Sequence, residues 1–208
     1  ILIFWLSTRL TSTKNSKNHN CKELFHEASV RVPLIIFDPR PEADNTRGTV
    51  SDDFVEAIDL VPTFLDATGA EEASHRLEGR SLEPILHGKQ LEDWRDDVFS
   101  EIDYAFYQAR ETLDVGASEA RGYMIRTDRW KYVHFKHFPP QLFDLENDPD
   151  EFNDLGRDSS FEDVRQMMHQ RLVDRLLNRK NRVTMRDEAV ENVRNQEDAS
   201  GILIGRWS

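Results

Sequence analysis

Residues 30–37 restrict the fold of this chain more than any other part of the sequence. They form a continuous apolar run, VRVPLIIF, interrupted only by Arg31 and Pro33. An apolar run without alternation is typical of a parallel strand that helices cover on both faces. Pro33 lies early in the run, where losing a backbone N–H matters least, and the DPRP sequence at 38–41 ends the strand. The run therefore predicts an α/β domain.

The residues after this strand carry the signals of a helix. The stretch 54–69 predicts a helix that Asp59 caps, with Pro62 in its first turn and Gly69 at its end. The stretch 77–88 predicts a turn followed by a short helix. These elements extend the α/β part toward a change in composition near residue 92, where we expect a boundary.

The second half of the chain predicts an antiparallel sheet under a helix. The sequences VFSEI, GYMIRT, WKYVHF and LFDLEN predict strands with one covered face. Ser160 is expected to cap a long helix over residues 161–179, whose apolar side chains recur at helical spacing and would cover the sheet. Residues 104–120 are less regular, and we interpret them as a functional or interaction loop.

The charge and cysteine content exclude several classes of function. The chain has 39 acidic and 27 basic residues, a net charge of −12, and no basic block, which argues against nucleic acid and anionic membranes as partners. Cys21 is the only cysteine, so no internal disulfide and no cysteine zinc cluster can form, and a reducing compartment such as the cytoplasm is favoured. No apolar run approaches the length of a membrane span.

Three blocks of the sequence resemble the sulfatase family. The first joins Lys22, Glu27 and the RVP sequence at 31–33. The second is EAIDLVPTFLDATG followed by EGRSLEPIL, and the third is MIRTDRWKYVHF followed by QLFDLENDPDEFNDLG. Their order and spacing match the family over roughly residues 20–180. The sequence HFKHFPPQLFDLENDP and the ending GILIGRW are most similar to the phosphonate monoester hydrolase branch, beside the arylsulfatases in the alkaline phosphatase superfamily.

The resemblance implies a fold and a division into parts. Residues 1–92 would be the end of an alkaline-phosphatase-like α/β domain, with an aberrant stretch at 7–21. Residues 93–180 would be a small antiparallel sheet subdomain covered by a long helix. Residues 181–208 would be a tail, whose apolar end is expected to dock either on the body of the same chain or on a second subunit. Because residues 1–6 read as a buried strand, we expect the start of the large domain to be missing.

The resemblance also implies a reaction, the metal-dependent hydrolysis of sulfuric or phosphonic and phosphoric esters. A complete family member is expected to carry formylglycine, made from a Cys or Ser in a [CS]-x-[PA]-x-R motif, and a divalent metal, calcium or manganese. Lys22 occupies the position of the anion-binding catalytic lysine. Tyr104 and His134 are candidates for substrate contacts. Glu27 is interpreted as structural, pairing with Arg31 or capping a turn.

This sequence departs from the family pattern at the metal site. The nucleophile motif is not present, and Cys21 lacks the flanking residues that would make it a substitute. Arg9 and Leu10 stand where the resemblance places an Asp-His pair, so no metal is expected here. Residues 7–21 contain three basic residues and no acidic one. One hypothesis is a reading-frame shift over the metal-ligand loop, and the alternative is true divergence into a pseudoenzyme.

Two functions therefore stay open. The first is the C-terminal portion of a hydrolase that acts on a small sulfate or phosphonate ester and is inactive as this chain alone. The second is a non-catalytic scaffold that forms a homo-oligomer through residues 104–120 and 181–208. An unpaired strand edge at the start of the chain predicts poor solubility in either case.

Overall fold

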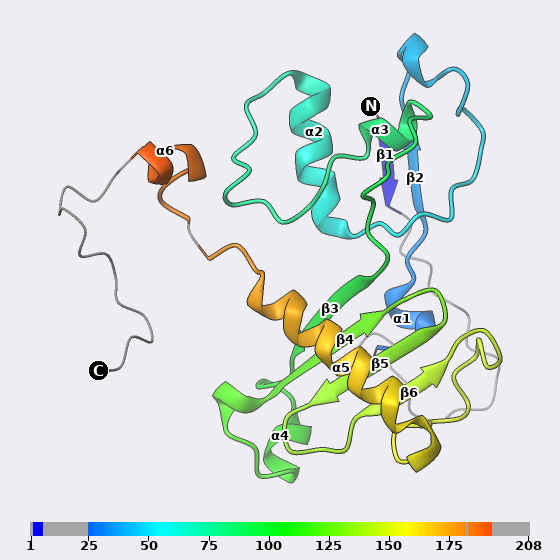
Figure 1. Cartoon of the computed structure of the whole chain (residues 1–208), viewed down its shortest axis with the longest axis vertical. Helices are drawn as coiled ribbons and strands as arrows, with labels where there is room; N and C mark the ends of the chain where they lie inside the picture. Colours follow the sequence, from blue (N-terminus) through cyan, green and yellow to red (C-terminus); the bar gives the residue numbers. More distant parts are fainter. Residues whose placement is uncertain (1, 6–24, 182, 193–208) are drawn as a thin grey trace, which may run out of the picture.

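The computed structural model describes residues 2–5, 25–181 and 183–192, with side chains for 25–181 and 183–190 (Figure 1). The described elements are, in chain order, β1 (Leu2–Trp5), α1 (Glu27–Val30), β2 (Leu34–Phe37), η2 (Pro41–Ala43), η3 (Ala57–Asp59), α2 (Leu60–Thr68), α3 (Glu83–Leu86), β3 (Val98–Asp103), α4 (Gln108–Thr112), η4 (Ala117–Glu119), β4 (Arg121–Arg126), β5 (Trp130–Phe135), β6 (Gln141–Asp144), η5 (Ser159–Phe161), α5 (Glu162–Leu177) and α6 (Asp187–Asn192). No helix of the described part is long and apolar enough to cross a membrane.

The apolar run at 30–37 folds differently from the prediction. Only Leu34–Phe37 is a strand, and it pairs antiparallel with β1, Leu2 opposite Phe37. Its burial alternates, with Ile35 51% and Phe37 41% exposed. The prediction of a parallel strand buried on both faces is therefore wrong for the described structure, because one face of β2 is left uncovered by the described residues.

The helix α2 follows the predicted sequence signals closely. Pro62 lies near its start, where a missing N–H costs no hydrogen bond, and is buried. Gly69 ends the helix in the left-handed region at φ +65°, and its N–H bonds back to the carbonyls of Asp66 and Leu65. The side chain of Asp59 makes no capping hydrogen bond to α2, contrary to the prediction, because it is used elsewhere.

The predicted antiparallel sheet is present with four strands in the order β3-β4-β5-β6. The β4–β5 hairpin places Gly122 opposite Phe135 and Arg126 opposite Lys131. Helix α5 crosses one face, where it buries Met168 and Leu172 against Ile125, Tyr132 and Leu142 (Figure 1). The β4–β5 hairpin, the strand predicted at LFDLEN and the covering helix are confirmed.

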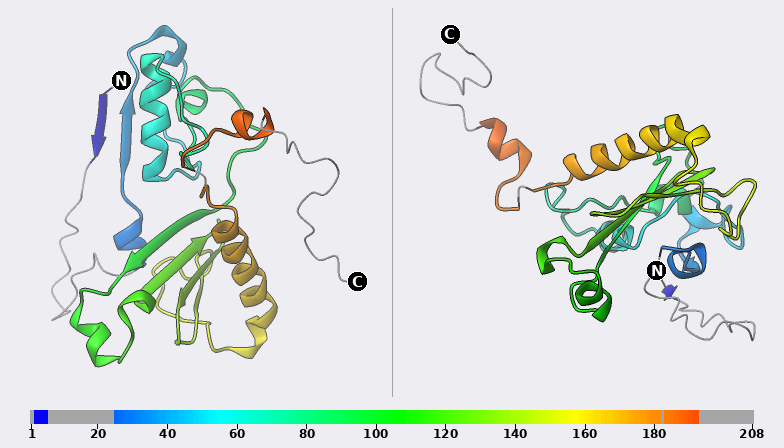
Figure 2. Two further views of the ribbon diagram at one scale, coloured as in Figure 1. Left: turned by 90° about the vertical axis from the view of Figure 1, so that its left-hand side faces the viewer. Right: turned by 90° about the horizontal axis from the view of Figure 1, so that it is seen from below.

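The sheet is covered on both faces, so the prediction of a single covered face is wrong. Lys131, Tyr132 and Val133 are consecutive and all buried, which requires cover on each side of β5. Figure 2 shows the sheet between α5 and α1. On the α1 side, Phe25 packs against Met124 and Val133. The sequence pattern missed this cover because it comes from a segment about a hundred residues away.

The start of α5 also differs in detail. Ser160 was expected to cap the helix, but it lies inside the η5 turn that precedes it. The carboxylate of Asp158 accepts hydrogen bonds from the Ser160 N–H at 2.9 Å and the Ser160 hydroxyl at 2.6 Å. Asp158 therefore caps η5, because its side chain accepts a free N–H group of that turn, and the N-cap position of α5 itself is Phe161, which makes no side-chain capping hydrogen bond.

Candidate functional site

Lys22 lies outside the described residues, and the segment that follows it is described from Phe25 onward. Phe25 is buried, 6% exposed, against the α1 side of the sheet. The next residues turn into α1, whose first residue is Glu27. The candidate site is therefore built from the contacts that hold residues 25–27 in place.

A buried charge cluster holds this segment. Lys131 of β5 is 0% exposed, and its Nζ donates to the Phe25 carbonyl at 2.9 Å and to Glu151 Oε1 at 2.6 Å. The other carboxylate oxygen of Glu151 accepts the Glu27 N–H at 2.7 Å and lies 3.3 Å from His26 Nδ1. A buried charge is tolerated only when it is paired and hydrogen-bonded. We call Lys131 and Glu151 the clamp.

Glu27 has a structural role, but its partners differ from the prediction. Its Oε1 lies 2.6 Å from Lys131 Nζ and 3.2 Å from Arg126 Nε. Neither approach has the angle of a hydrogen bond, so these are ion-pair contacts. Arg31, the expected partner, is exposed and lines the cavity described below. The prediction of a Glu27–Arg31 pair is wrong because residues remote in sequence supply closer cations.

These contacts fix both the backbone conformation and the ionisation of Glu151. Its backbone lies in the left-handed region at φ +58°, which costs a non-glycine residue energy unless its surroundings fix it. Burial raises the pKa of its carboxyl, but hydrogen bonds from His26, Lys131 and the Glu27 N–H outweigh burial and lower this pKa to about 2. Glu151 therefore stays a carboxylate at neutral pH.

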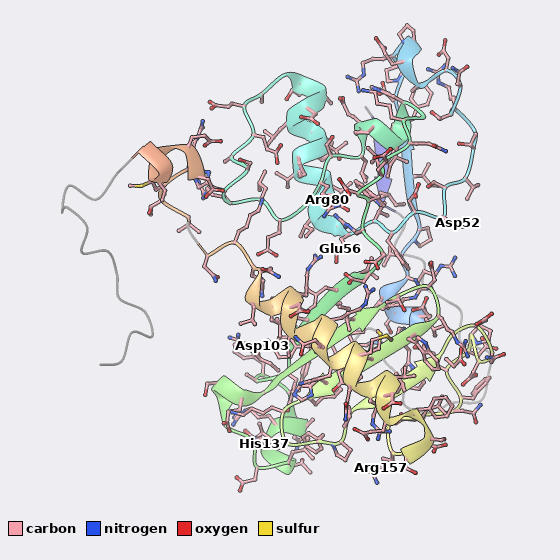
Figure 3. The ribbon with its side chains drawn as sticks, viewed as in Figure 1. Asp52, Glu56, Arg80, Asp103, His137 and Arg157 are labelled. Carbon is pink, nitrogen blue, oxygen red and sulfur yellow. The ribbon has the colours of Figure 1, made fainter. Side chains whose placement is uncertain are left out.

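A second network joins the EAIDLVPTFL and EGRSL blocks. Asp59, 0% exposed, receives two hydrogen bonds from Arg95 and two from the backbone N–H groups of Glu56 and Arg80. Figure 3 shows Glu56 and Arg80 near the end of α2 that faces the sheet. This use of its carboxylate explains why Asp59 is not free to cap α2.

Gly79 makes this network possible. A Cβ at this position would lie 2.1 Å from the Ile58 carbonyl oxygen, well inside contact distance. The missing side chain lets the backbone at Gly79 approach η3 closely enough for the Arg80 N–H to reach Asp59 at 2.8 Å.

Glu56 connects this network to the sheet. Its Oε1 accepts the Phe99 N–H of β3 at 2.7 Å, and its Oε2 accepts from Arg175 of α5 at 2.8 Å. Arg95 also donates to Glu56 at 3.0 Å. The second sequence block therefore ties the α2 part to the sheet and its covering helix.

A third cluster follows β2. Asp38 is buried and accepts hydrogen bonds from the Arg40 guanidinium, and His87 Nε2 lies 3.1 Å from Asp38 Oδ2. The Arg40 guanidinium holds the pKa of the Asp38 carboxyl well below its usual range, against the opposing effect of burial. Arg40 also contacts Glu83 at the start of α3. These contacts fix the turn after β2 on α3.

A cavity of about 730 Å³ lies between residues 29–34, the loop 51–57 and the strands β3 and β4. Its ionisable lining is mostly acidic, with two arginines, Arg31 and Arg126, against six carboxylates: Glu27, Asp52, Asp53, Glu56, Glu101 and Asp128. Such a lining repels an anionic ester. This cavity alone is therefore a poor site for a sulfate or phosphonate.

The two candidate substrate contacts lie apart. Tyr104 is buried, packs edge-on against Phe135, and its hydroxyl has no hydrogen-bond partner among the described residues. His134, the neighbour of Phe135 on β5, points to the opposite face, where its ring lies 5.6 Å from that of His169 on α5. Burial, and then the charge of His169, lowers the pKa of His134. Neither residue lines the cavity described above.

The described residues contain no group of three or more His, Cys, Asp or Glu side chains that could hold a metal ion. Positions 9, 10 and 22 lie outside the described part. The described residues therefore do not form a metal centre, and we assign them no step of metal chemistry.

The contact between Lys131 and Glu151 was not predicted from the sequence. A lysine inside a strand normally reads as exposed. The available signal was its position, because Lys131 shares a strand face with Val133 and Phe135, which lie two and four residues further on. Glu151 belongs to the third sequence block, but nothing local in that block indicates its partner.

Comparison with known proteins identifies the family. Residues 18–178 match the family described as "N-sulphoglucosamine sulphohydrolase, C-terminal". The chain is 34% identical over 140 residues to the multifunctional alkaline phosphatase superfamily protein PehA of Trinickia caryophylli, covering 66% of this chain and 27% of that protein. It is 31% identical over 155 residues to arylsulfatase K of Canis lupus familiaris, covering 73% of this chain and 26% of that protein.

Two solved structures share the fold. The phosphonate monoester hydrolase of Agrobacterium radiobacter is 34% identical with a TM-score of 0.65, covering 72% of this chain and 30% of that chain. The enzyme of the same name from Silicibacter pomeroyi is 32% identical with a TM-score of 0.67, covering 77% of this chain and 32% of that chain. The chain thus spans about a quarter to a third of the length of these relatives. It belongs to the C-terminal family of the sulfatases, within the alkaline phosphatase superfamily that also includes the phosphonate monoester hydrolases.

Proposed function

We propose that this chain supplies the C-terminal part of a hydrolase that cleaves sulfate esters or phosphonate and phosphate esters. The observation that supports this proposal is the anchoring of residues 25–27, which begin three positions after Lys22, by hydrogen bonds from a folded subdomain. A rigid scaffold that presents one residue at the end of a loop is the usual way to place a group that binds substrate.

Lys22 has the role of binding a non-bridging oxygen of the substrate. A sulfate or phosphonate ester carries negative charge on these oxygens, and a fixed ammonium stabilises the charge as it shifts in the transition state. The sulfatase family implies that complete enzymes also carry formylglycine as nucleophile and a divalent metal, calcium or manganese. The described residues provide neither, so the nucleophile must come from another part of the protein.

The test uses the product of the complete reading frame that contains this chain. It should hydrolyse 4-nitrophenyl sulfate or 4-nitrophenyl phenylphosphonate in the presence of Mn²⁺ or Ca²⁺. Lys22→Ala should lower kcat/KM by about 100-fold or more. The control Lys17→Ala, in the same polar segment, should leave it unchanged. The 208-residue chain alone should show no turnover. Absence of hydrolysis, or equal rates for wild type and Lys22→Ala, would overturn the proposal.

Tyr104 and His134 remain predictions for substrate contacts. Tyr104→Phe removes only a hydroxyl that lacks a partner among the described residues, so it should not weaken folding. A rise in KM for this variant, or for His134→Ala, would support a contact with substrate. An unchanged KM in both variants would assign them to packing alone.

A non-catalytic scaffold is the second candidate, and the observation that favours it is Arg9-Leu10 at the position of the metal-binding pair. This candidate predicts no hydrolysis by the complete product and a stable homo-oligomer through residues 181–208. Size-exclusion chromatography with light scattering tests it, because deletion of residues 199–208 should then yield monomers.

We also propose that the protein is located in the cytoplasm. The support for this location is that the sequence contains a single cysteine, which is more common in a reducing compartment.

A further inference from the structure

We propose that His134 of β5 and His169 of α5 form a pH-sensitive contact, which loosens the covering helix from the sheet when the solution becomes mildly acidic. The two imidazole rings face each other between helix and sheet, with their centroids 5.6 Å apart and their planes at 53°. Helix α5 lies across β5 (Figure 1). We call His134 and His169 the histidine pair.

His134 is poorly placed to carry a proton on both ring nitrogens. Its Nδ1 is buried and has no hydrogen-bond partner among the described residues. An imidazolium has an N–H at each nitrogen, so protonated His134 would hold a donor and a positive charge where nothing described accepts them. Burial, and then the charge of His169, accordingly lower the pKa of His134.

The side chains of α5 at this place do not offset such a charge. The Tyr132 hydroxyl, on the same face of β5, lies 3.2 Å from His169 Nδ1. The Arg165 guanidinium is close enough to Tyr132 to oppose the rise in the pKa of that phenol that burial causes. The carboxylates of α5 are all on exposed residues: Glu162, Asp163 and Asp174.

The sheet side of the histidine pair offers no free carboxylate either. Tyr123 of β4 lies directly opposite His134. Toward β6, the pairing ends one residue before His134, opposite the uncharged Gln141. Two carboxylates occur around this end of the sheet, and each is paired with a cation: Glu101 with Arg179, and Glu119 with Lys136.

Three other histidines of the described part have the opposite surroundings. A carboxylate oxygen lies 3.3 Å from His26, 3.1 Å from His87 and 3.6 Å from His137. Each of these rings therefore has an anion beside it when it gains a proton. In the histidine pair, a proton on either ring instead places a cation beside the other ring, and two protons place like charges together.

The position of the histidine pair makes the whole helix sensitive to it. His169 lies between Met168 and Leu172, the two buried residues of α5 that pack on the sheet. Further along the same helix, Arg175 donates to Glu56 at 2.8 Å. Loosening α5 would consequently weaken both the cover of the sheet and its connection to the α2 part.

The direction of the pKa shift gives the pH window. Because the folded pKa of His134 lies below the ordinary value of 6.5, its stabilising contribution is complete above pH 6.5 and is lost as the pH falls. Glu151 of the clamp has a folded pKa of about 2 and stays charged throughout this window. A change between pH 7.5 and pH 5.5 is therefore not due to that carboxylate.

Hydrogen exchange of the product of the complete reading frame tests the proposal without using hydrolysis. After correction for the intrinsic pH dependence of exchange, protection of the peptide 164–176 should fall by about threefold or more from pH 7.5 to pH 5.5. His134→Phe keeps an aromatic ring that cannot be protonated, and should largely abolish this fall. Constant protection in wild type, or an equal fall in wild type and His134→Phe, would overturn the proposal.

His137→Asn is the matched control, because His137 is an exposed histidine just after β5 and asparagine tolerates its left-handed backbone at φ +70°. This variant should show the same fall in protection as wild type. If His134→Phe fails to fold, His134→Gln takes its place.

A second readout tests the pairing itself. Deuterium uptake at the imidazole Cε1–H, followed by mass spectrometry, reports the protonation of single histidines. His169→Gln removes the charge beside His134 and should raise the pKa of His134, whereas burial keeps it below the ordinary value. An unchanged pKa of His134 in this variant would show that the two rings do not act as a pair, and would overturn the proposal.

Discussion

Arg95 binds Asp59 through two hydrogen bonds, from Nη1 to Oδ2 at 2.7 Å and from Nη2 to Oδ1 at 2.5 Å. The two residues are 36 positions apart, and their side chains are 4% and 0% exposed. A bidentate contact of this kind fixes both distance and orientation. It therefore sets how the segment before β3 lies against η3 and α2.

Breaking this pair should destabilise the protein strongly. Arg95→Met leaves the Asp59 carboxylate buried without its main partner, and such a change costs about 3–5 kcal/mol of the free energy of unfolding. Urea denaturation followed by circular dichroism measures it. The control Arg186→Met removes an exposed pair with Glu71 and should leave the urea midpoint unchanged. Equal midpoints for the two variants would contradict this prediction.

Gly79→Ala should destabilise the same region for a different reason. The added Cβ would meet backbone atoms, the Ile58 oxygen at 2.1 Å and the Asp59 nitrogen at 2.9 Å, which cannot move aside as a side chain can. We expect a loss of about 1–3 kcal/mol of unfolding free energy. Gly116→Ala is the matched control, because its Cβ would have no atom nearer than 3.5 Å. A loss of equal size in both variants would show that close approach is not the cause.

Glu151 should make stability depend on pH in the acid range. Its folded pKa, about 2, lies below the ordinary value of 4.5, so its contribution is complete above pH 4.5 and is lost as the pH falls toward 2. Between pH 5 and pH 3 this amounts to a loss on the order of 2 kcal/mol.

Glu151→Gln provides the comparison, because glutamine does not titrate. Urea unfolding at several pH values should show a smaller decrease for this variant than for wild type between pH 5 and pH 3. Parallel curves would mean that Glu151 has its ordinary pKa in the folded protein.

Asp158→Ala should weaken the η5 turn that leads into α5. The carboxylate accepts the Ser160 N–H at 2.9 Å, and alanine leaves that donor without its partner. We expect faster hydrogen exchange in η5 and a lower melting temperature. Ser159→Ala, one residue along, is the control and should change neither. Exchange that is equally fast in both variants would rule out Asp158 as the cap.

Local patterns predicted the local elements correctly. Alternation and turn residues were enough for the β4–β5 hairpin, and Gly69 was enough for the end of α2. A strand was predicted over residues 30–37, and only Leu34–Phe37 forms one. Its cover was also predicted wrongly, because burial depends on what packs against a strand. The prediction that Ser160 caps the long helix was wrong, since Asp158 caps the η5 turn before α5, and both residue types are good caps that sequence alone does not rank.

The contacts at the candidate site could not be predicted in the same way. Lys131 reaches Phe25 across 106 positions, and Glu151 reaches Glu27 across 124. No periodicity in one sequence relates positions so far apart. Family resemblance indicated which blocks belong together, but the contacts between the first and third blocks became visible only in the structure.

The strand order β3-β4-β5-β6 has a consequence for how the protein is made. Neighbouring strands of this sheet are also neighbours along the chain, so they can pair soon after synthesis, as contacts local in sequence form fastest. The segment at 25–27 leaves the ribosome first, yet its anchor Glu151 emerges 124 residues after Glu27. The segment at 25–27 thus waits until all four strands of the sheet have been made. A chain that ends between residues 144 and 151 contains every strand of the sheet but lacks Glu151, so its strands can pair while residues 25–27 are without that anchor.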